Sequence, residues 1–297
     1  MNVTDRAMRW MLARCVGRES LERLIRRAAN LAQIDLLRVA YQSIGVLNYE
    51  THVASGEQFL IARILPRLMG GDKPVILDVG ANIGEVSLAL CRAFPAARVW
   101  AFEPNPVTFG VLEQRLEGTG VACRRMALGA AAGEATLHCY AGDRTSGHAS
   151  MYAGVFGLYG NYGVRGADQL TTFAIAVTTI DAFCREHEIV HIDFLKIDVE
   201  GHELAVLRGA SGTLADRRIG AIQFEFNECN VLSRVFLRDF YALLPGYRLF
   251  RLNTSGLVPL TGYRARNEIF QYQNLLAVRA EFADRVDEFA TDRGEGA

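Results

Sequence analysis

The chain has 297 residues, a hydrophobic content of 50%, a net charge of −1 and an isoelectric point near 6.6. This length and apolar content suit one large α/β domain with an extension. The balanced charge provides no strong positive field for nucleic acid or an anionic membrane. No apolar run approaches the roughly 20 residues of a membrane span.

The N-terminal region has a helical pattern over residues 1–46. Leu21, Leu24 and Ile25 recur at helical spacing, with Arg23 and Arg26 on the other side. We expect a helical cap that packs on the core or on a second copy as a homodimer; the alternative is a segment that faces a partner or a membrane surface. A second helix is predicted from about Gly56 to Met69, ending at Gly70.

Strands and helices alternate from residue 75 onward. Strands are predicted at 75–79, 98–102, 121–128, 134–140, 192–199, 219–226, 247–252 and 273–278. Helices are predicted at 85–94, from 106 to about 116, at 180–187 and from about 202 to 209 or 212. This rhythm predicts a mostly parallel, doubly wound sheet. The expected division is a helical extension over 1–70, an α/β domain over 71–281 and a C-terminal tail over 282–297, of which the last few residues are expected to be frayed.

One stretch interrupts the alternation. Residues 141–170 contain seven glycines and several tyrosines. A loop of this length is often a lid or a binding loop, and a surface excursion without a chemical role is the alternative.

The six cysteines are scattered without a Cys-x-x-Cys pair, and Arg9 and Arg14 flank the short apolar run near the N-terminus. We therefore expect free thiols in a cytoplasmic protein, with no signal peptide and no zinc site.

A glycine turn follows the first predicted strand and carries the clearest functional signal. Asp78 lies in the strand, and Gly80, Asn82 and Gly84 follow it. In open α/β sheets, such a turn holds a nucleotide-like ligand at the strand's carboxyl end. The spacing is not Gly-x-Gly-x-x-Gly, and the turn lacks the Gly-Lys-Ser/Thr of triphosphate sites. An acid before the turn and no phosphate-binding lysine suit a ligand without phosphates, such as S-adenosylmethionine.

Glu103 ends the second predicted strand, 19 residues after Gly84. An acid at about this distance typically accepts hydrogen bonds from the ribose hydroxyls. Asn82 is expected either to bond the ligand's amino acid end or to satisfy the turn backbone. Met126 and Ala127, at the end of the third strand, are expected either to flank an adenine ring or to lie in the core.

A second polar segment ends the strongly apolar strand at 192–199. Asp198, Glu200, His202 and Glu203 lie within six positions. Burying so many ionisable groups costs several kcal/mol unless they are paired or used. A strand end is a site position in such sheets, so we favour a functional use. Lys196 pairing with one of these acids is the structural alternative.

These segments together resemble the FkbM family of class I S-adenosylmethionine-dependent methyltransferases. The matching motifs are Asp78–Gly84, Phe102–Pro106, Val177–Asp181, Phe194–Glu203, Val206–Ala210 and Phe224–Glu225, within a resemblance over about residues 46–278. The resemblance implies a Rossmann-like, seven-stranded sheet and O-methylation of a hydroxyl group. It also implies that Asp78, Gly80, Asn82, Gly84 and Asn105 frame the cofactor, that Glu103 holds its ribose, and that Asp198 lies beside its methyl group.

The expected reaction is in-line displacement at the sulfonium methyl by a substrate oxygen. The candidate general bases are Asp198, Glu200, His202 and His148. A metal-assisted variant would use Asp198, Glu225 and Asn227, at neighbouring strand ends, as oxygen ligands for Mg²⁺.

The expected acceptor is a hydroxyl of a small molecule, a sugar, a lipid-linked glycan or a secondary metabolite. Two other classes stay open: a nucleic-acid methyltransferase, and a binding module that has lost catalysis. The net charge of −1 argues against a nucleic-acid methyltransferase, because binding to phosphates depends on basic residues.

Overall fold

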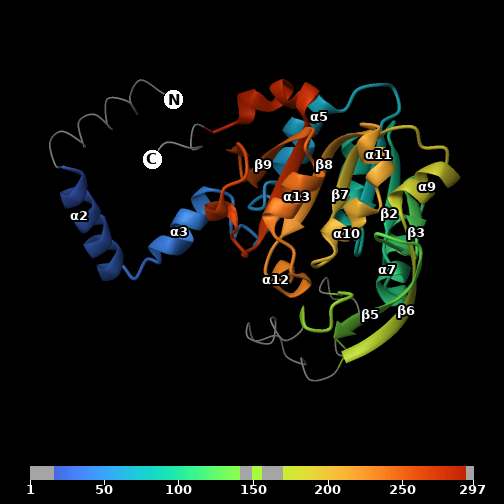
Figure 1. The fold of residues 1–297 in the computed structure, drawn as a ribbon, viewed down its shortest axis with the longest axis horizontal. Coiled ribbons are helices and arrows are strands. Elements are labelled where there is room, and N and C mark those ends of the chain that lie inside the picture. The colour runs from blue at the N-terminus through green and yellow to red at the C-terminus, as the bar shows by residue number, and fades with distance from the viewer. Residues whose placement is uncertain (1–16, 141–148, 156–169, 292–297) are drawn as a thin grey trace.

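The computed structural model describes residues 17–140, 149–155 and 170–291, and its largest element is an eight-stranded sheet (Figure 1). The strand order is β10-β9-β11-β8-β7-β1-β2-β3. The strands are β1 (Val75–Val79), β2 (Arg98–Phe102), β3 (Ala122–Arg124), β7 (Ile192–Ile197), β8 (Ile219–Phe226), β9 (Tyr247–Asn253), β10 (Gly256–Leu260) and β11 (Gln273–Arg279).

Strands β3, β2, β1, β7 and β8 pair in parallel. Strand β11 is antiparallel to both β8 and β9, so β9 runs in the direction of the parallel set, and β10 pairs antiparallel with β9. This topology confirms the mostly parallel, Rossmann-like α/β fold. The family resemblance implies seven strands, and the main sheet has eight; the edge strand β10 was not predicted, and it contains Pro259 at a position where proline is tolerated.

Helices cover both faces of the sheet, so the fold is doubly wound as predicted. One core cluster joins β1, β7 and β8 to the helices drawn in front of the sheet in Figure 1, and a second joins the opposite face to α6, α5 and η3. The helices after β1 are α6 (Glu85–Ala93), α7 (Pro106–Leu116), α9 (Ile180–Glu186), α10 (Glu203–Arg208), α11 (Ser211–Ala215), α12 (Cys229–Ser233) and α13 (Leu237–Leu243), with 3₁₀ helices η2 (Ala265–Asn267) and η3 (Ala280–Phe289).

A second, three-stranded sheet has the order β4-β6-β5. It comprises β4 (Ala127–Leu128), β5 (Gly133–Tyr140) and β6 (Leu170–Thr178). The single strand expected at 121–128 was therefore wrong: the chain leaves the main sheet after Arg124 and pairs again at Ala127 with β6. Strand β6 was not predicted, and most of residues 141–170, including His148, lie outside the described residues.

The N-terminal region forms α2 (Arg18–Leu31) and α3 (Leu36–Ser43), followed by α4 (Glu57–Phe59), a π-helix η1 (Leu60–Ile64) and α5 (Leu65–Leu68). The last three confirm the predicted second helix. The continuous helix expected over 1–46 is interrupted, because the Asp35 side chain accepts from the Leu37 and Arg38 amides and starts a new helix. Helices α2 and α3 extend away from the sheet (Figure 1). Residues 1–16 lie outside the described part of the chain. Formation of a homodimer through the N-terminal helices stays a prediction.

The C-terminal segment is partly ordered against the core. Ala283 and Val286 of η3 are fully buried, so the tail predicted to begin at 282 packs on the sheet at least as far as Phe289. In the part of the chain that the structure describes, no helix combines the length and apolar character that crossing a bilayer requires.

Candidate active site

A row of polar side chains crosses one face of the main sheet beneath the strand ends. In the sheet, Asp78 on β1 is paired with Lys196 on β7, and Lys196 is paired in turn with Gln223 on β8. Side chains alternate between the faces of a strand, so these three share a face. All three are at most 3% exposed, which makes the row a buried polar layer next to apolar neighbours.

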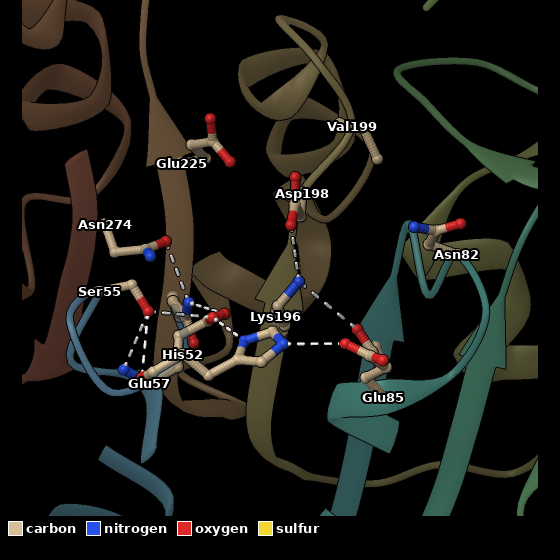
Figure 2. Close-up of polar contacts among 12 residues, drawn as sticks. His52, Ser55, Glu57, Asn82, Glu85, Lys196, Asp198, Val199, Glu225 and Asn274 are labelled. Atoms are coloured by element: carbon tan, nitrogen blue, oxygen red, sulfur yellow. Dashed lines mark hydrogen bonds and ion pairs between the residues drawn. The ribbon is translucent and has the colours of Figure 1, made fainter. Parts of the chain in front are cut away.

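The ammonium of Lys196 is the central charge of this row. Its Nζ lies 2.9 Å from Asp198 Oδ2 (Figure 2). The same Nζ lies 3.9 Å from Asp78 Oδ1. Burial acts to lower the pKa of Lys196, but the carboxylates of Asp198, Asp78 and Glu57 outweigh it and raise the pKa. Lys196 therefore stays charged, and Asp198 is its nearest partner.

Asp78 lies behind the site and does not line it. Its side chain is fully buried, and Oδ2 accepts a 2.6 Å hydrogen bond from Ser87 Oγ on α6. Burial raises the pKa of Asp78, with Lys196 and Ser87 acting in the opposite direction. The cofactor-contacting role expected for Asp78 thus becomes, in our interpretation, a supporting role beneath the turn.

The carboxyl ends of β1, β2, β7 and β8 surround a cavity of about 1040 Å³. Nine of the residues predicted from the sequence line it: Gly80, Asn82, Glu103, Met126, Ala127, Asp198, Glu200, Glu225 and Asn227. Four do not: Asp78, Gly84, Asn105 and His202. The cavity is at the upper end of the roughly 300–1,000 Å³ typical of ligand pockets.

Glu103 connects the ends of β1 and β2 at the cavity wall. One carboxylate oxygen accepts from the Asn82 amide at 3.0 Å, and the other accepts from the Asn105 amide at 2.9 Å. Burial raises the pKa of Glu103 to about 7 although both amides act to lower it. Asn105 itself caps α7, where its Oδ1 accepts from the Val107 and Thr108 amides.

The turn glycines are required by close approaches of the backbone. At Gly80 φ is +81°, and a Cβ would lie 1.8 Å from the backbone oxygen of Asp198. At Gly84 φ is +83°, and a Cβ would lie 2.7 Å from Leu112 Cδ1. Gly80 therefore lets the first turn pack against the end of β7, while Gly84 seats α6 against α7.

The acidic residues after β7 have two roles: one lines the cavity, and another binds backbone amides of the turn. Glu203 is 1% exposed, and its Oε1 accepts from the Val199 and Gly201 amides, both at 3.1 Å, which fixes the 199–201 turn. Burial raises the pKa of Glu203 to about 8. Glu200, at φ +53°, lines the cavity.

His202 lies away from the cavity. Its Nδ1 is 3.3 Å from the Tyr152 hydroxyl, and burial lowers its pKa to about 4. It precedes α10, yet its side chain makes no capping bond. Since His202 does not line the cavity, we propose no base role for it.

Two of the residues considered for Mg²⁺, Glu225 and Asn227, are hydrogen-bonded to each other, and the Mg²⁺ site stays a prediction. The Asn227 Nδ2 donates to Glu225, and the Asn227 Oδ1 accepts from the Cys229 amide at 2.8 Å, so both ends of this amide are engaged. Burial, followed by the nearby carboxylates of Asp198 and Glu200, raises the pKa of Glu225 well above its usual value. Within the described residues, no group of three or more His, Cys, Asp and Glu side chains could hold a metal ion.

A second charged cluster at the cavity was not predicted from the sequence. His52 lies between two carboxylates, with Nδ1 2.7 Å from Glu57 Oε2 and Nε2 3.1 Å from Glu85 Oε2 (Figure 2). Its hydrogen bond to Glu57 raises the pKa of His52 to about 9, against the effect of burial. Burial would raise the pKa of Glu57, but His52, Lys196 and Gln223 together lower it to about 2.

This cluster joins the N-terminal segment to the polar row. Gln223 Nε2 donates to Glu57 Oε1 and to Asn274 Oδ1, both at 3.1 Å. In the sequence, this cluster is visible only as polar residues just before the predicted helix at Gly56. These residues do not reveal their partners, which lie far along the chain.

The fold and this cavity define an α/β protein with a ligand site at the carboxyl ends of its parallel strands. The chain belongs to the FkbM methyltransferase family: its sequence matches the Methyltransferase FkbM domain over residues 78–244, more than half of its length. Its five described cysteines, Cys91, Cys123, Cys139, Cys184 and Cys229, are free thiols.

Similar proteins include the hexuronic acid methyltransferase AglP of Haloferax volcanii, 32% identical over 162 residues, which are 54% of this chain and 58% of that one. The 31-O-demethyl-FK506 methyltransferase FkbM of Streptomyces tacrolimicus is 33% identical over 186 residues, 53% of this chain and 70% of that one. The chain spans less than two thirds of the length of three curated relatives that it matches.

Among solved structures, a methyltransferase FkbM from Methylobacillus flagellatus superposes with a TM-score of 0.43 and 16% identity, covering 76% of this chain and 49% of that one.

Replacing Lys196 by methionine tests the role of the buried ammonium. We expect Lys196→Met to lower the free energy of unfolding by about 3–5 kcal/mol, because breaking a buried ion pair leaves an uncompensated charge. Urea unfolding measures the loss. The chain's other lysine, the exposed Lys73, provides the control, and Lys73→Met should change stability by less than about 0.5 kcal/mol. Equal losses of unfolding free energy in Lys196→Met and Lys73→Met would show that the buried ammonium of Lys196 does not stabilise the fold.

The His52 cluster predicts an unusual titration. The raised pKa means that the pair stabilises the folded state fully below the unfolded value near 6.5, and that this stabilisation is lost as the pH rises through about 9. An NMR titration of the imidazole should therefore have its midpoint near pH 9 in the intact protein. Glu57→Gln should move the midpoint toward 6.5, and an unchanged midpoint in this variant would show that Glu57 is not the cause.

Proposed function

We propose that the protein is an S-adenosylmethionine-dependent O-methyltransferase that methylates a hydroxyl of a sugar, a glycan or a secondary metabolite. The observation that carries the proposal is the buried carboxylate of Glu103, which lines the cavity beside the glycine turn after β1. Membership of a methyltransferase family supports the reaction class.

The sheet topology supports this place for the cofactor. In the sheet, β2 and β3 lie on one side of β1, and β7 and β8, which come later in the chain, lie on its other side. Ligands of open α/β sheets bind at such a switch point, outside the carboxyl ends of the strands. The turn at Gly80 and the ends of β2 and β7 meet at this point.

Each residue of this end of the cavity has a proposed task. Gly80 and Asn82 would frame the cofactor, with Gly84 supporting the turn from behind. Glu103 would accept from the ribose hydroxyls, and Met126 and Ala127 would flank the adenine ring. Asp198, oriented by Lys196, would lie beside the reacting end. When bound, S-adenosylmethionine supplies a methyl group already activated for displacement.

The protein's own contribution would be orientation and proton transfer. Holding the reactants in line is worth roughly 7–11 kcal/mol of the barrier, and a positioned base adds about 10²–10⁴-fold in rate. Of the bases considered from the sequence, Asp198 and Glu200 line the cavity and are the proposed acceptors of the hydroxyl proton.

The acceptor class is proposed from the similar proteins and from the size of the cavity. The named relatives include a hexuronic acid methyltransferase and a methyltransferase of 31-O-demethyl-FK506. Both names describe hydroxylated molecules, and the cavity leaves space for an acceptor of this kind beside a cofactor.

Calorimetric titration with S-adenosylmethionine tests the cofactor assignment. We expect Glu103→Ala to weaken binding at least tenfold, because the ribose loses its hydrogen-bond acceptor. Glu113, exposed on α7, provides a matched control, and Glu113→Ala should leave the affinity within about twofold. If the intact protein does not bind, the proposed function is wrong; if Glu103→Ala binds as tightly as the intact protein, only the ribose assignment is wrong.

The pKa of Glu103 also predicts a pH dependence of binding. Only the ionised carboxylate accepts through both oxygens, so affinity should increase as the pH rises through about 7. Comparing dissociation constants at pH 6 and pH 8 measures this increase. In Glu103→Gln the dependence should disappear, and its persistence there would assign it to another group.

A further inference from the structure

The N-terminal region differs in charge from the rest of the chain. Residues 1–46 contain eight basic and four acidic residues, whereas the remaining 251 residues contain 24 basic and 29 acidic ones. The net charge of −1 therefore combines an N-terminal segment of net charge +4 with a body of net charge −5. A positive charge confined to one end of a chain is typical of a segment that binds an anionic partner.

Helix α2, within this segment, separates apolar from charged side chains. Residues at three- and four-residue spacing share one face of a helix, and the apolar face of α2 consists of Leu21, Leu24, Ile25, Ala28 and Leu31. The other side carries Arg23, Arg26 and Arg27. Arg26 is paired within the helix, at 3.4 Å from Glu22, whereas no described residue forms an ion pair with Arg23 or Arg27.

Much of the apolar side of these helices is exposed. Leu24 is 61% exposed and Leu31 79%, and α3, none of whose residues is buried, adds Leu37 at 61%. Within the described chain, seven of the sixteen exposed large hydrophobic residues lie between residues 24 and 39. Figure 1 shows both helices extending away from the sheet. Such a concentration of exposed apolar side chains marks an interaction surface.

We propose that α2 and α3 form a docking surface for an anionic lipid bilayer. Helix α2 would lie along the membrane surface, with Leu24 and Leu31 between the headgroups and the acyl chains. Arg23 and Arg27 would extend to the lipid phosphates, because long arginine side chains keep their charge in the polar layer while their stems cover apolar surface. This is peripheral binding, and it agrees with the lack of a membrane-spanning helix in the described part of the chain. The inference goes beyond the proposed function and does not depend on it.

The homodimer considered from the sequence is the competing occupant of this surface. A two-fold contact through these helices places the same segment of both copies at the interface. Two segments of net charge +4 would then lie close together, and like charges across an interface oppose association. Anionic headgroups attract the same arginines, so the charge of the segment favours the lipid surface.

Flotation of the full chain with lipid vesicles tests the charge part of the proposal. The probes are vesicles of phosphatidylcholine alone and vesicles of phosphatidylcholine and phosphatidylglycerol in equal parts. We expect at least tenfold tighter binding to the anionic vesicles. The double variant Arg23→Gln/Arg27→Gln should bind the anionic vesicles at least tenfold more weakly than the intact protein, because two cations near the headgroups are lost.

A second double variant tests the apolar part. Leu24→Ser/Leu31→Ser should weaken binding to the anionic vesicles at least tenfold, because the two most exposed apolar side chains of α2 no longer leave water. Val190, 76% exposed before β7, provides the matched control, and Val190→Ser should bind within about twofold of the intact protein. All of these positions are exposed, so the variants should unfold in urea at the same midpoint as the intact protein.

Three results would overturn the proposal: no binding to vesicles, equal binding to neutral and anionic vesicles, or unchanged binding in either double variant. Sedimentation of the same preparations would then identify another occupant. A dimer that Leu24→Ser/Leu31→Ser dissociates would assign the surface to a second copy. A monomer would leave residues 1–16 of the same chain as the candidate that covers it.

Discussion

The buried ammonium of Lys196 is the interaction on which the candidate site depends. It lies between the strand-end carboxylate of Asp198 and the fully buried Asp78, and it lines the cavity. Without it, two carboxylates would share a poorly solvated space, and at least one of them would have to protonate or move. The ammonium thus holds the end of β7 against the turn after β1, where Gly80 packs directly on the backbone of Asp198.

The same charge connects the N-terminal segment to the sheet. Glu57 lies within the electrostatic influence of Lys196, accepts from Gln223 and pairs with His52, which in turn reaches Glu85 at the start of α6. Several residues of the segment 47–57 consequently line the cavity: Leu47, Tyr49, Glu50, Thr51, His52, Ser55 and Glu57. The segment just before the family-matched region therefore takes part in shaping the site, while α2 and α3 extend beyond it.

Short-range patterns in the sequence predicted much of the fold and one side of the site. The glycine turn and the spacing to Glu103 are local signals, and both correspond to residues at the cavity. Asp78 shows what the sequence does not give: its side chain is fully buried and accepts from Ser87 on α6, a partner that lies outside the motif. Two strands were not identified from the sequence: the edge strand β10, which contains Pro259, and the nine-residue strand β6.

The other side of the site could not be predicted because it is assembled by tertiary contacts. Glu57 accepts from Gln223 and lies within the electrostatic influence of Lys196, and both partners are more than a hundred residues away along the chain. No local pattern around His52 identifies these partners. The acidic segment after β7 was correctly singled out, but only the structure separates Glu200 at the cavity from Glu203, which satisfies turn amides.

A crystal structure of the protein with S-adenosylhomocysteine tests the central claim most directly. The account predicts ligand density in the cavity, with the ribose hydroxyls within hydrogen-bonding distance of Glu103 and the sulfur near Asp198, while the Lys196–Asp198 pair stays intact. Density that lies elsewhere, or a ligand bound with Glu103 and Asp198 out of contact, would contradict it.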